Sequence, residues 1–473
     1  MVSLFIFHRD LRLDDNTALL ECIKNSTHVI PVFIFPPEQI DSRINKYFSH
    51  PAVQFMIQSL IDLNEHLHKY GSQLYMFKGN TIDVLKNIHK QIQYTQIYSN
   101  RDYSRYAVKR DKEISDWTKK FSSGSSVTIE YKDEQDYDLI NMEEADGKVY
   151  KVLSPYYKKF ASGIFHVRKP ISFPKNVAIF SKTKLHGNLS SSDILHFFTE
   201  NPNIKVKGGR ISGGGLAILE RIRHKDFKDY KKERDFPAIE GTTRASAYLK
   251  FGCISVREMY WALHEVGGND LIRELVFRSF YYRIYGNNLD LLNGKAYHDK
   301  VDSKIPWETN KKYYDAWKTG KTGFPLSDAG MRQLIGENWV HNRVRMLVAN
   351  IATKYLLLDW RECLKYFYQN LVDADIFSNT AGWQWGSGIG VDSTPYFRAP
   401  FNPFIQSKKF DKDAEYIKRW IPELKDVAAR DIHNWGDPKV RAKYPDCKYP
   451  PPLVDQKEAS HKAIRVFKTA ASG

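Results

Sequence analysis

The chain begins with short apolar runs separated by segments whose apolar residues recur at helical spacing. The apolar runs cover residues 2–7, 29–35, 73–77, 96–98 and 127–131. Helical spacing occurs over residues 18–23, 53–67 and 84–88. Continuous apolar strands that alternate with helices are typical of a parallel sheet covered on both faces. The pattern therefore predicts an α/β domain with a Rossmann-like parallel sheet over residues 1–132.

The pattern changes twice further along the chain. Between residues 133 and 206 the periodicity weakens and proline and serine interrupt it, which predicts a long interdomain linker. Helical periodicity follows over residues 256–266, 270–285, 329–334, 340–357 and 360–371. The remainder after Leu424 is proline-rich and polar. We expect an all-helical domain over residues 207–473.

Composition adds an expectation about partners. The chain carries a net charge of +16, and 14% of its residues are aromatic. A positive excess of this size favours a polyanionic partner such as nucleic acid, although solubility alone is the simpler explanation. The four cysteines are far apart, which argues against a disulfide framework or a cysteine zinc site, and we expect no metal. We find no signal peptide and no apolar run of ~18 residues, so we expect a soluble intracellular protein of cytoplasm or nucleus, without membrane contact.

The segment 337–385 is too polar for an ordinary helical core and too rich in tryptophan for an ordinary surface. Cores favour aliphatic side chains and leave arginine and aspartate outside unless these are paired. On the helix that begins here, Asn342, Arg345 and Met346 share one face because they are three or four positions apart. The segment therefore predicts the wall of a site for something polar and flat.

Two aspartates follow in the same segment. Asp373 and Asp375 lie two positions apart, and either can pair with Arg345. A buried ion pair is costly unless it is well bonded, so such a pair would indicate a function beside a cofactor ring. A structural salt bridge is the alternative. His341 has no second histidine at ligand spacing, so we expect a packed or surface histidine.

A second candidate site lies on the predicted helix 270–285. Glu274, Phe277, Arg278 and Tyr281 share one face of that helix. A carboxylate beside an aromatic ring suits a nucleobase, because the carboxylate bonds the edge of the base while the ring covers its face. A surface ion pair between Glu274 and Arg278 is the alternative.

A third candidate is the start of a helix near Ser246. Thr242, Thr243 and Arg244 directly precede it. Hydroxyl groups and backbone N–H groups at a helix N-terminus suit a diphosphate. Ordinary capping by threonine is the alternative. The usual nucleotide motifs are absent, since no Gly-x-Gly-x-x-Gly follows the first strand and no P-loop lysine follows the glycine-rich turns.

Seven motifs occur in order along the chain. They are RDFPAIEGTTRAS, RELVFRSFYYR, GKTGFPLSDAGMRQL, NWVHNRVRM, DWRE, DADIFSNTAGWQW and PYFRAPFNPFIQSKKFD. Together they resemble the photolyase/cryptochrome family and are most similar to its class I cyclobutane pyrimidine dimer photolyases. The resemblance implies an N-terminal α/β antenna domain and a C-terminal helical domain that holds FAD. It also implies repair of UV-damaged DNA, in which light drives an electron from reduced FAD to a flipped-out dimer.

The resemblance also implies which residues hold the cofactor. The positions that match FAD-phosphate contacts are Tyr230, Thr242, Thr243, Arg244, Ala245 and Ser246. The positions that match the surroundings of the flavin are Arg278, Asn342, Arg345, Asp373, Asp375 and Asn379. Asn379 would face the flavin N5 atom.

Further matches concern the lesion, the DNA and electron transfer. The lesion pocket would contain Glu274, Asn342, Met346 and Trp385. Glu274 would hydrogen-bond the dimer and stabilise its developing charge, and Trp385 would stack on a flipped base. DNA contacts would also come from Phe277, Arg343 and Arg398. Trp383, Trp360 and Trp307 match the family's tryptophan chain, which carries electrons inward to FAD.

Two positions depart from the class I pattern. Phe277 stands where that pattern has tryptophan, and it offers less area for stacking on the lesion. The folate-binding members carry Asn-Glu where this chain has Tyr106-Ala107, so the resemblance does not extend to a folate antenna. A deazaflavin, another flavin or an empty second chromophore pocket remain open.

Three rival functions are distinguishable in the sequence. A (6-4) photolyase has a histidine pair where this chain has His341-Asn342. Plant-type cryptochromes, which are photoreceptors without repair activity, have aspartate at the position of Asn379, and many cryptochromes carry a long tail. A non-catalytic nucleic-acid-binding protein would leave the tryptophan set unexplained. These features favour an enzyme that repairs dimers. We also expect the protein to be a monomer.

Overall fold

The computed structural model describes residues 1–140, 150–175, 180, 183–393 and 400–472. The chain forms two compact units, each built from two stretches of sequence. Unit 1 contains Met1–Lys228 and Thr243–Leu289, and unit 2 contains Asp229–Thr242 and Asp290–Gly473. The domain boundaries expected at residues 132 and 206 both fall inside unit 1.

Unit 1 contains a five-stranded sheet in which every pair of neighbouring strands is parallel. Its strands are β1 (Val2–Phe7), β2 (His28–Phe35), β3 (Tyr75–Lys78), β4 (Gln96–Arg101) and β5 (Glu130–Gln135). They lie in the order β3-β2-β1-β4-β5. In register, Leu4 of β1 lies opposite Ile30 of β2 and Ile97 of β4. The predicted α/β fold is confirmed, and all five apolar runs contribute to strands.

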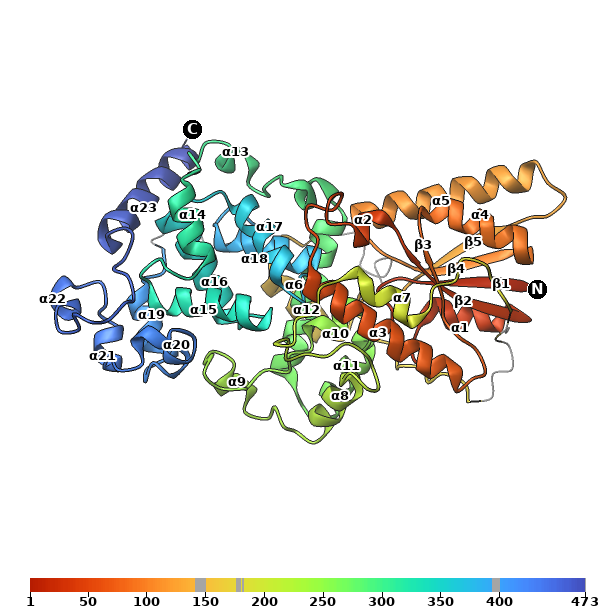
Figure 1. Cartoon of the computed structure of the whole chain (residues 1–473), viewed down its shortest axis with the longest axis horizontal. Helices are drawn as coiled ribbons and strands as arrows, with labels where there is room; N and C mark the ends of the chain where they lie inside the picture. The colour runs from red at the N-terminus through yellow and green to blue at the C-terminus, as the bar shows by residue number, and fades with distance from the viewer. Residues whose placement is uncertain (141–149, 176–179, 181–182, 394–399, 473) are drawn as a thin grey trace. The chain divides into compact units, whose positions relative to one another are not determined.

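Helices cover both faces of this sheet (Figure 1). Helices α4 (Thr81–Ile92) and α5 (Arg105–Ser123) lie on one face, and α1 (Thr17–Lys24) and α3 (His50–His68) lie on the other. Buried apolar side chains of α4 and α5 form a core with those of the strands, and α1 and α3 also bury apolar side chains such as Leu19 and Leu60. Burial on both faces explains why β1 and β2 are almost continuously apolar rather than alternating.

The rest of unit 1 is mostly helical. Its other helices are α2 (Pro37–Ile40), α6 (Leu153–Ala161), α7 (Ser191–Ile194), η1 (Leu195–Phe197), α8 (Gly215–Arg223), α10 (Ser246–Phe251), α11 (Val256–Glu265) and α12 (Asn269–Gly286). Helix α12 packs against α6 and α11. A hydrogen bond of 3.0 Å joins the hydroxyl groups of Tyr156 on α6 and Ser279 on α12. Part of the predicted linker is therefore a packed helix.

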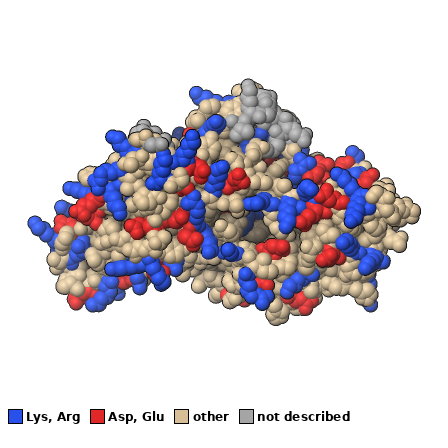
Figure 2. Space-filling view, turned by 90° about the horizontal axis from the view of Figure 1, so that it is seen from above, with Lys and Arg blue, Asp and Glu red and all other residues tan. Residues whose placement is uncertain are grey.

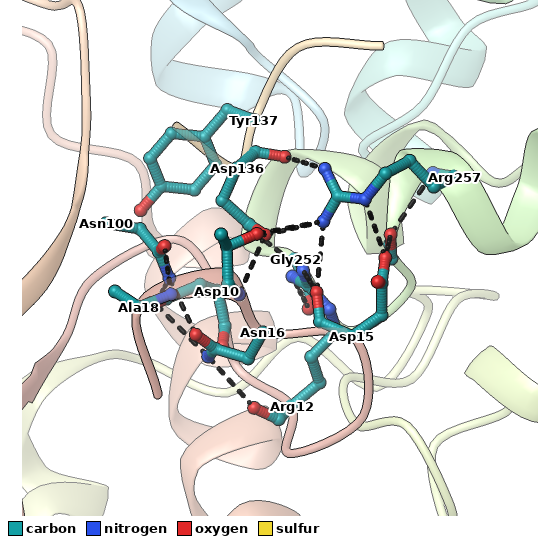
Figure 3. A network of polar contacts seen from close by, with 12 residues as sticks. Asp10, Arg12, Asp15, Asn16, Ala18, Asn100, Asp136, Tyr137, Gly252 and Arg257 are labelled. Carbon is teal, nitrogen blue, oxygen red and sulfur yellow. Dashed lines mark hydrogen bonds and ion pairs between the residues drawn. The ribbon is translucent and has the colours of Figure 1, made fainter. Parts of the chain in front are cut away.

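A buried ion network in unit 1 joins the loop after β1, the end of β5 and α11 (Figure 3). Arg257 donates to Asp15 at 2.8 Å and to Asp136 at 2.6 Å. Arg12 donates to the other oxygen of Asp136 at 2.6 Å and to the Gly252 carbonyl at 3.2 Å. We call Arg12, Asp15, Asp136 and Arg257 the unit 1 ion network. Because these residues are distant in sequence, the network fixes segments that the sheet does not hold.

Unit 2 is helical, as predicted for the C-terminal part of the chain. Its helices are α9 (Tyr230–Glu233), α13 (Asp299–Asp302), α14 (Lys311–Lys318), α15 (Pro325–Glu337), α16 (Asn342–Asn350), η3 (Ile351–Tyr355), α17 (Trp360–Asn370), α18 (Ile376–Gly386), α19 (Pro403–Phe410), α20 (Glu415–Trp420), η4 (Pro422–Leu424), α21 (Ala429–Ile432), α22 (Pro438–Arg441) and α23 (Gln456–Ser472). The chain passes from unit 1 to unit 2 within η2 (Leu289–Asn293).

Two details of unit 2 differ from the prediction. The predicted helix 340–357 is α16 followed by a π-helical turn, η3, and such turns break the regular spacing. The proline-rich remainder ends in the 17-residue helix α23, which buries Ala459, Ala463, Phe467 and Ala470. Three of these four side chains are alanines, and their small size hides the helical pattern. None of the described helices is long and apolar enough to cross a membrane.

Candidate functional site

The segment 337–385 forms three consecutive helices, α16, α17 and α18, in unit 2. Arg345 lies on α16, one turn after its N-terminus, and its side chain is 26% exposed. Asp373 and Asp375 lie in the buried connection between α17 and α18. Asn379 lies one turn into α18. We call Arg345, Asp373, Asp375 and Asn379 the unit 2 polar cluster.

Arg345 and Asp373 form the expected ion pair. One terminal nitrogen of Arg345 lies 2.9 and 3.1 Å from the two carboxylate oxygens of Asp373. The Nε atom of Arg345 also donates to the Val340 carbonyl at 2.7 Å, which fixes the guanidinium plane. Asp375 has a different task, because it caps α18 by accepting from the backbone N–H groups of Phe377 and Ser378. Of the two candidate aspartates, Asp373 is thus the partner of Arg345.

Asn379 is the member of this cluster with unused hydrogen-bonding capacity. Its backbone N–H donates to the Asp375 carbonyl at 2.9 Å, as in a regular helix. Its side-chain Nδ2 atom is buried and has no hydrogen-bond partner among the described residues. A buried donor without a partner costs about 1–3 kcal/mol, so native proteins usually satisfy it or reserve it for a ligand. The amide is therefore suited to donate to a ring nitrogen or carbonyl of a bound molecule.

Three residues expected at the lesion lie toward the surface of unit 2. Asn342 is exposed at the start of α16, and Met346 and Trp385 are half-buried. The Nε1 atom of Trp385 donates to the Asp392 carbonyl at 3.2 Å, which fixes the indole plane. His341, which we expected to be packed or on the surface, is buried and caps α16 by accepting from the Arg343 N–H. Asn342, Met346 and Trp385 are therefore accessible enough to contact a flat ligand.

The expected phosphate contact Arg343 has partners within unit 2. Its guanidinium donates to Asp235 at 2.6 and 3.1 Å and lies 4.7 Å from the ring centroid of Phe410. A phosphate that bound Arg343 would therefore compete with Asp235. Arg398, the second expected contact, lies outside the described residues.

The three chain tryptophans differ in burial. Trp360 and Trp383 are buried, whereas Trp307 is half-buried. The indole N–H groups of Trp307 and Trp360 donate to the same oxygen of Asp302, at 3.0 and 3.1 Å. Trp383 lies on α18, which packs against α17, the helix that Trp360 begins. The structure therefore brings Trp307 and Trp360 together through an aspartate.

Sequence reasoning missed residues around these tryptophans. Asp302 gave no signal, because a single aspartate five positions before a tryptophan matches no motif. Trp317 is fully buried and lies edge-to-face against Trp383, with ring centroids 5.9 Å apart. It lies just before the GKTGFP motif, and nothing in its sequence context distinguishes it from an ordinary core residue. The ring centroids of Phe367 and Trp383 lie 5.0 Å apart.

In unit 1, helix α12 carries the second candidate site. Glu274, Phe277, Arg278 and Tyr281 are all half-buried, as expected for residues that share a face. The rings of Phe277 and Tyr281 have centroids 6.0 Å apart. Arg278 donates to the Tyr137 carbonyl at 2.6 Å and also bonds the hydroxyl of a tyrosine on its own helix. The helix therefore presents a carboxylate and two aromatic rings side by side.

The residues before α10 have an unusual backbone. Arg244 has a φ angle of +50°, in the left-handed region that non-glycine residues rarely adopt. Such conformations concentrate at ligand sites. The N-cap residue of α10 is Ala245, and no side chain caps the helix. Thr243 instead accepts from the Ala245 N–H at 3.3 Å. The structure thus contradicts the alternative that a threonine caps this helix.

Comparisons with known proteins agree with this organisation. Residues 3–175 match a family model described as DNA photolyase, and residues 271–469 match the FAD binding domain of DNA photolyase. A deoxyribodipyrimidine photo-lyase from Halobacterium salinarum is 31% identical, and the alignment covers 99% of both chains. The chain belongs to the photolyase/cryptochrome family.

Solved structures extend the match to three dimensions. An archaeal photolyase from Sulfolobus tokodaii, solved with two FAD molecules, is 36% identical with a TM-score of 0.86, covering 99% of this chain and 100% of that one. A class III photolyase from Agrobacterium tumefaciens is 29% identical with a TM-score of 0.87, covering 100% and 98%. The α/β antenna fold followed by a helical FAD-binding fold is thus shared with photolyases.

FAD is the cofactor of this photolyase-family chain, and two local features fit such a group. The unpartnered Nδ2 donor of Asn379 suits the polar edge of a flavin ring. The uncapped N-terminus of α10 suits a phosphate. No group of three or more histidine, cysteine, aspartate or glutamate side chains that could hold a metal is found among the described residues.

The sheet of this photolyase-family chain has a topological switch point. The strand order reverses between β1 and β4, and ligands of open α/β sheets bind outside the carboxyl ends at such a point. His8 and Tyr103 follow these two strands, and His8 Nε2 and Tyr103 Oη are buried without hydrogen-bond partners among the described residues. Burial, with help from Arg110, holds the pKa of His8 well below its usual value, so the ring is neutral.

Charge on the surface is mixed. On the face shown in Figure 2, lysine and arginine side chains are interspersed with aspartate and glutamate. The net charge of +16 therefore does not gather into one continuous patch on this face. A specific DNA site has to be argued from individual residues rather than from this view.

Proposed function

We propose that this chain is a light-dependent DNA repair enzyme that splits cyclobutane pyrimidine dimers. The observation that carries the proposal is the full-length similarity to deoxyribodipyrimidine photo-lyases, which are 31–33% identical over 98–99% of this chain. The local geometry supports it, because a buried ion pair, an unfilled amide donor and two indoles bridged by one carboxylate are arranged in unit 2. An ordinary helical core has no use for these groups.

Reduced FAD, when bound, supplies the electron that light transfers to the dimer. The residues of the unit 2 polar cluster would hold the flavin. Asn379 would donate its unpartnered Nδ2 hydrogen to the flavin ring, and the Arg345–Asp373 pair would present a fixed dipole with no net charge. In a low-dielectric site such preorganised donors stabilise developing negative charge without having to reorient.

The phosphates of FAD are assigned to the segment before α10 and to a residue on α9. Arg244 has a left-handed backbone, and Thr242, Thr243, Ala245 and Ser246 flank it. Tyr230, the first residue of α9, is the remaining phosphate contact. Arg278 belongs to the surroundings of the flavin. These assignments rest on the family resemblance and on the uncapped helix start.

By the family resemblance, the dimer would be bound by polar and aromatic residues of three helices, α12, α16 and α18. Glu274 hydrogen-bonds the lesion and stabilises its charge, and Phe277 covers it. Asn342, Met346 and Trp385 complete the lining, with the fixed indole plane of Trp385 stacking on a flipped base. Phe277 offers less area than tryptophan, so stacking contributes less to the affinity for the dimer than in class I relatives.

Trp383, Trp360 and Trp307 supply electrons to oxidised FAD under illumination. The gradient in burial supports this order, because an electron hole that moves toward the half-buried Trp307 can be refilled by a reductant in solution. Arg343 and Arg398 bind DNA phosphates, and Arg343 exchanges Asp235 for a phosphate. Binding should weaken with salt because phosphate contacts release counterions.

A second chromophore is assigned to the edge of the sheet between β1 and β4. The buried atoms His8 Nε2 and Tyr103 Oη are free to bond it. The Sulfolobus tokodaii relative was solved with two FAD molecules, which favours another flavin over a deazaflavin. We also infer that the protein is a monomer, which analytical ultracentrifugation at micromolar concentration tests.

The function is tested by blue-light repair of two oligonucleotides side by side, one with a cyclobutane dimer and one with a (6-4) product. With FAD bound and reduced, we expect splitting of the cyclobutane dimer in the light and none in the dark. Repair of the (6-4) product alone would reassign the substrate. Repair of neither lesion by the reduced holoprotein would contradict the enzymatic function and favour a photoreceptor.

Glu274→Ala tests the lesion site separately. We expect repair per bound FAD to fall by about tenfold while the FAD content stays the same, because the carboxylate contacts the dimer and not the cofactor. Equal losses of repair and FAD would indicate that Glu274 is structural. Glu265→Ala, at the exposed end of α11, is the matched control and should change neither quantity.

A further inference from the structure

One buried carboxylate in unit 2 connects two indoles. Asp302 is the last residue of α13 and is only 3% exposed. Its Oδ1 atom accepts from Nε1 of Trp307 at 3.0 Å and from Nε1 of Trp360 at 3.1 Å. The two tryptophan segments are held together independently, because the Glu308 N–H donates to the Leu357 carbonyl at 2.7 Å. Both indole N–H groups therefore point at the same oxygen.

The other carboxylate oxygen of Asp302 is paired with Arg361. That guanidinium lies over the ring of Trp360, with its central carbon 4.8 Å from the ring centroid. A cation over an indole face stabilises the neutral ring, but it opposes a positive charge on that ring. Trp307 has a different surrounding, since its ring neighbour is Phe467 at 6.1 Å and it is half-buried. Positive charge is therefore less costly on Trp307 than on Trp360.

We propose that Asp302 accepts the Nε1 proton of Trp307 after that indole has been oxidised. This inference rests on the proposed role of the tryptophan chain. In the step, Trp307 gives one electron to oxidised Trp360, which returns to its neutral form. The Nε1–H bond of Trp307 then breaks, and its proton forms an O–H bond with Asp302 Oδ1. Trp307 is left as a neutral radical.

The geometry supports this proton transfer over loss to water. Removing an electron from an indole makes its N–H strongly acidic, and the only acceptor bonded to this N–H among the described residues is the Asp302 carboxylate. Protonation of Asp302 does not leave Arg361 unpaired, because the guanidinium also donates to Asp359 at 3.1 Å. The neutral radical holds no hole that could return inward, so the transfer makes charge separation last longer.

The cycle closes with an external thiol as reductant. The thiol gives one electron to the Trp307 radical, and the proton returns from Asp302 to Nε1, which restores both side chains. The thiol loses its own proton to solvent and becomes a thiyl radical, and two such radicals combine to form a disulfide. Asp302 is thus a reversible proton store, and its charge is the same before and after each cycle.

The test is flash photolysis of the FAD-loaded protein with transient visible absorption, which distinguishes the cation radical of tryptophan from the neutral radical. In the native protein we expect the neutral radical to form at a rate that does not depend on buffer concentration, because the acceptor is internal. In Asp302→Asn, which keeps the size but not the basicity, we expect formation at least about tenfold slower and dependent on buffer. Asp299→Asn removes an exposed carboxylate from the same helix and should behave as the native protein.

Each outcome decides one question. A buffer-dependent rate in the native protein, or an unchanged rate in Asp302→Asn, would overturn the role of Asp302, and the native measurement decides even where the variant does not fold. Trp360→Phe tests the underlying chain, since it should abolish the Trp307 radical in any case. A persisting Trp307 radical in Trp360→Phe would contradict the proposed electron path and not only the proton acceptor.

Discussion

Buried charges occur in both units of this chain, and the two sets are completed differently. In the unit 1 ion network, Arg257 bonds two aspartates and Arg12 bonds Asp136 and a backbone carbonyl. In the unit 2 polar cluster, the Nδ2 donor of Asn379 has no partner among the described residues. The polar atoms of the first set are satisfied within the protein, and the second keeps a donor for a ligand. Burial of charge alone therefore does not identify a functional site.

The carboxyl groups show the same contrast in their protonation. Burial alone would raise the pKa of Asp136, but the guanidinium groups of Arg12 and Arg257 hold it far below its usual value. Asp328 in unit 2 has no such partner in its hydrogen bonds, which come from Thr322, Gly323 and Tyr449, and burial raises its pKa to about 6. A buried aspartate stays ionised when arginines surround it and tends to be neutral when only hydroxyl and N–H donors do.

The largest expected effect comes from removing one arginine from the unit 1 ion network. Arg257→Leu removes the largest counter-charge of Asp15 and one of the two arginines that bond Asp136, so we expect a loss of about 3–5 kcal/mol in the free energy of unfolding. Denaturant unfolding of the purified protein measures it. Arg223→Leu, at an exposed position in the same unit, should change stability by less than about 0.5 kcal/mol. If both variants were equally stable, the network would be incidental.

The second prediction concerns Asp328, the buried carboxyl of unit 2 whose pKa is raised. Because the folded-state pKa of Asp328 is raised to about 6, this group contributes stability that is fully present below its unfolded value of 3.8. That contribution is lost as the pH rises through about 6, and it amounts to about 3 kcal/mol. We expect Asp328→Asn to remove this part of the pH dependence, since its amide can donate to Thr322 and its oxygen can accept from Tyr449.

The measurement for Asp328 is the difference in unfolding free energy between variant and native protein, taken at several pH values from 4 to 8. Taking the difference cancels other titrating groups, including Asp10 in unit 1, whose pKa burial also raises to about 6. The difference should shift in favour of the variant as the pH rises. A difference that is constant with pH would show that Asp328 is ionised throughout.

The smallest expected effect concerns Asn379 in the unit 2 polar cluster. Asn379→Leu removes a donor that no described residue uses, so the FAD-free protein should lose less than about 1 kcal/mol of stability. Binding of FAD should weaken by about fivefold, because a hydrogen bond in a buried site contributes about 1 kcal/mol. Fluorescence titration with FAD measures the binding. A large loss of stability with unchanged FAD affinity would place Asn379 in the structural class.

The sequence was most informative where one physical signal dominated. Residues 2–7 and 29–35 are continuously apolar because helices bury both faces of their strands, and both were predicted to within a residue. Helix α23 was missed because its buried face consists mainly of alanines, such as Ala459 and Ala463, which give little periodic signal. The helix through residue 350 was predicted, but periodicity could not reveal the π-helical turn that follows it.

The candidate site also contains residues that helical spacing predicts and residues whose contacts depend on the fold. Helical spacing correctly placed Asn342, Arg345 and Met346 on one helix and indicated an aspartate partner for Arg345. It could not select Asp373 over Asp375, because that choice depends on how the chain turns before α18. Nor could it find Asp302, whose bonds to two tryptophans depend on segments 58 positions apart meeting in the fold.

The most direct test of the account is dimer splitting by Trp307→Phe protein whose FAD has been chemically reduced beforehand. Light-driven repair needs reduced FAD but not the tryptophan chain, so this variant should split dimers in blue light at the native rate and not at all in the dark. The same variant with oxidised FAD should photoreduce it at least about tenfold more slowly than the native protein. Failure of the pre-reduced variant to repair, while the native protein repairs, would contradict the assignment of Trp307 to electron supply alone. Failure of both proteins would contradict the repair function itself.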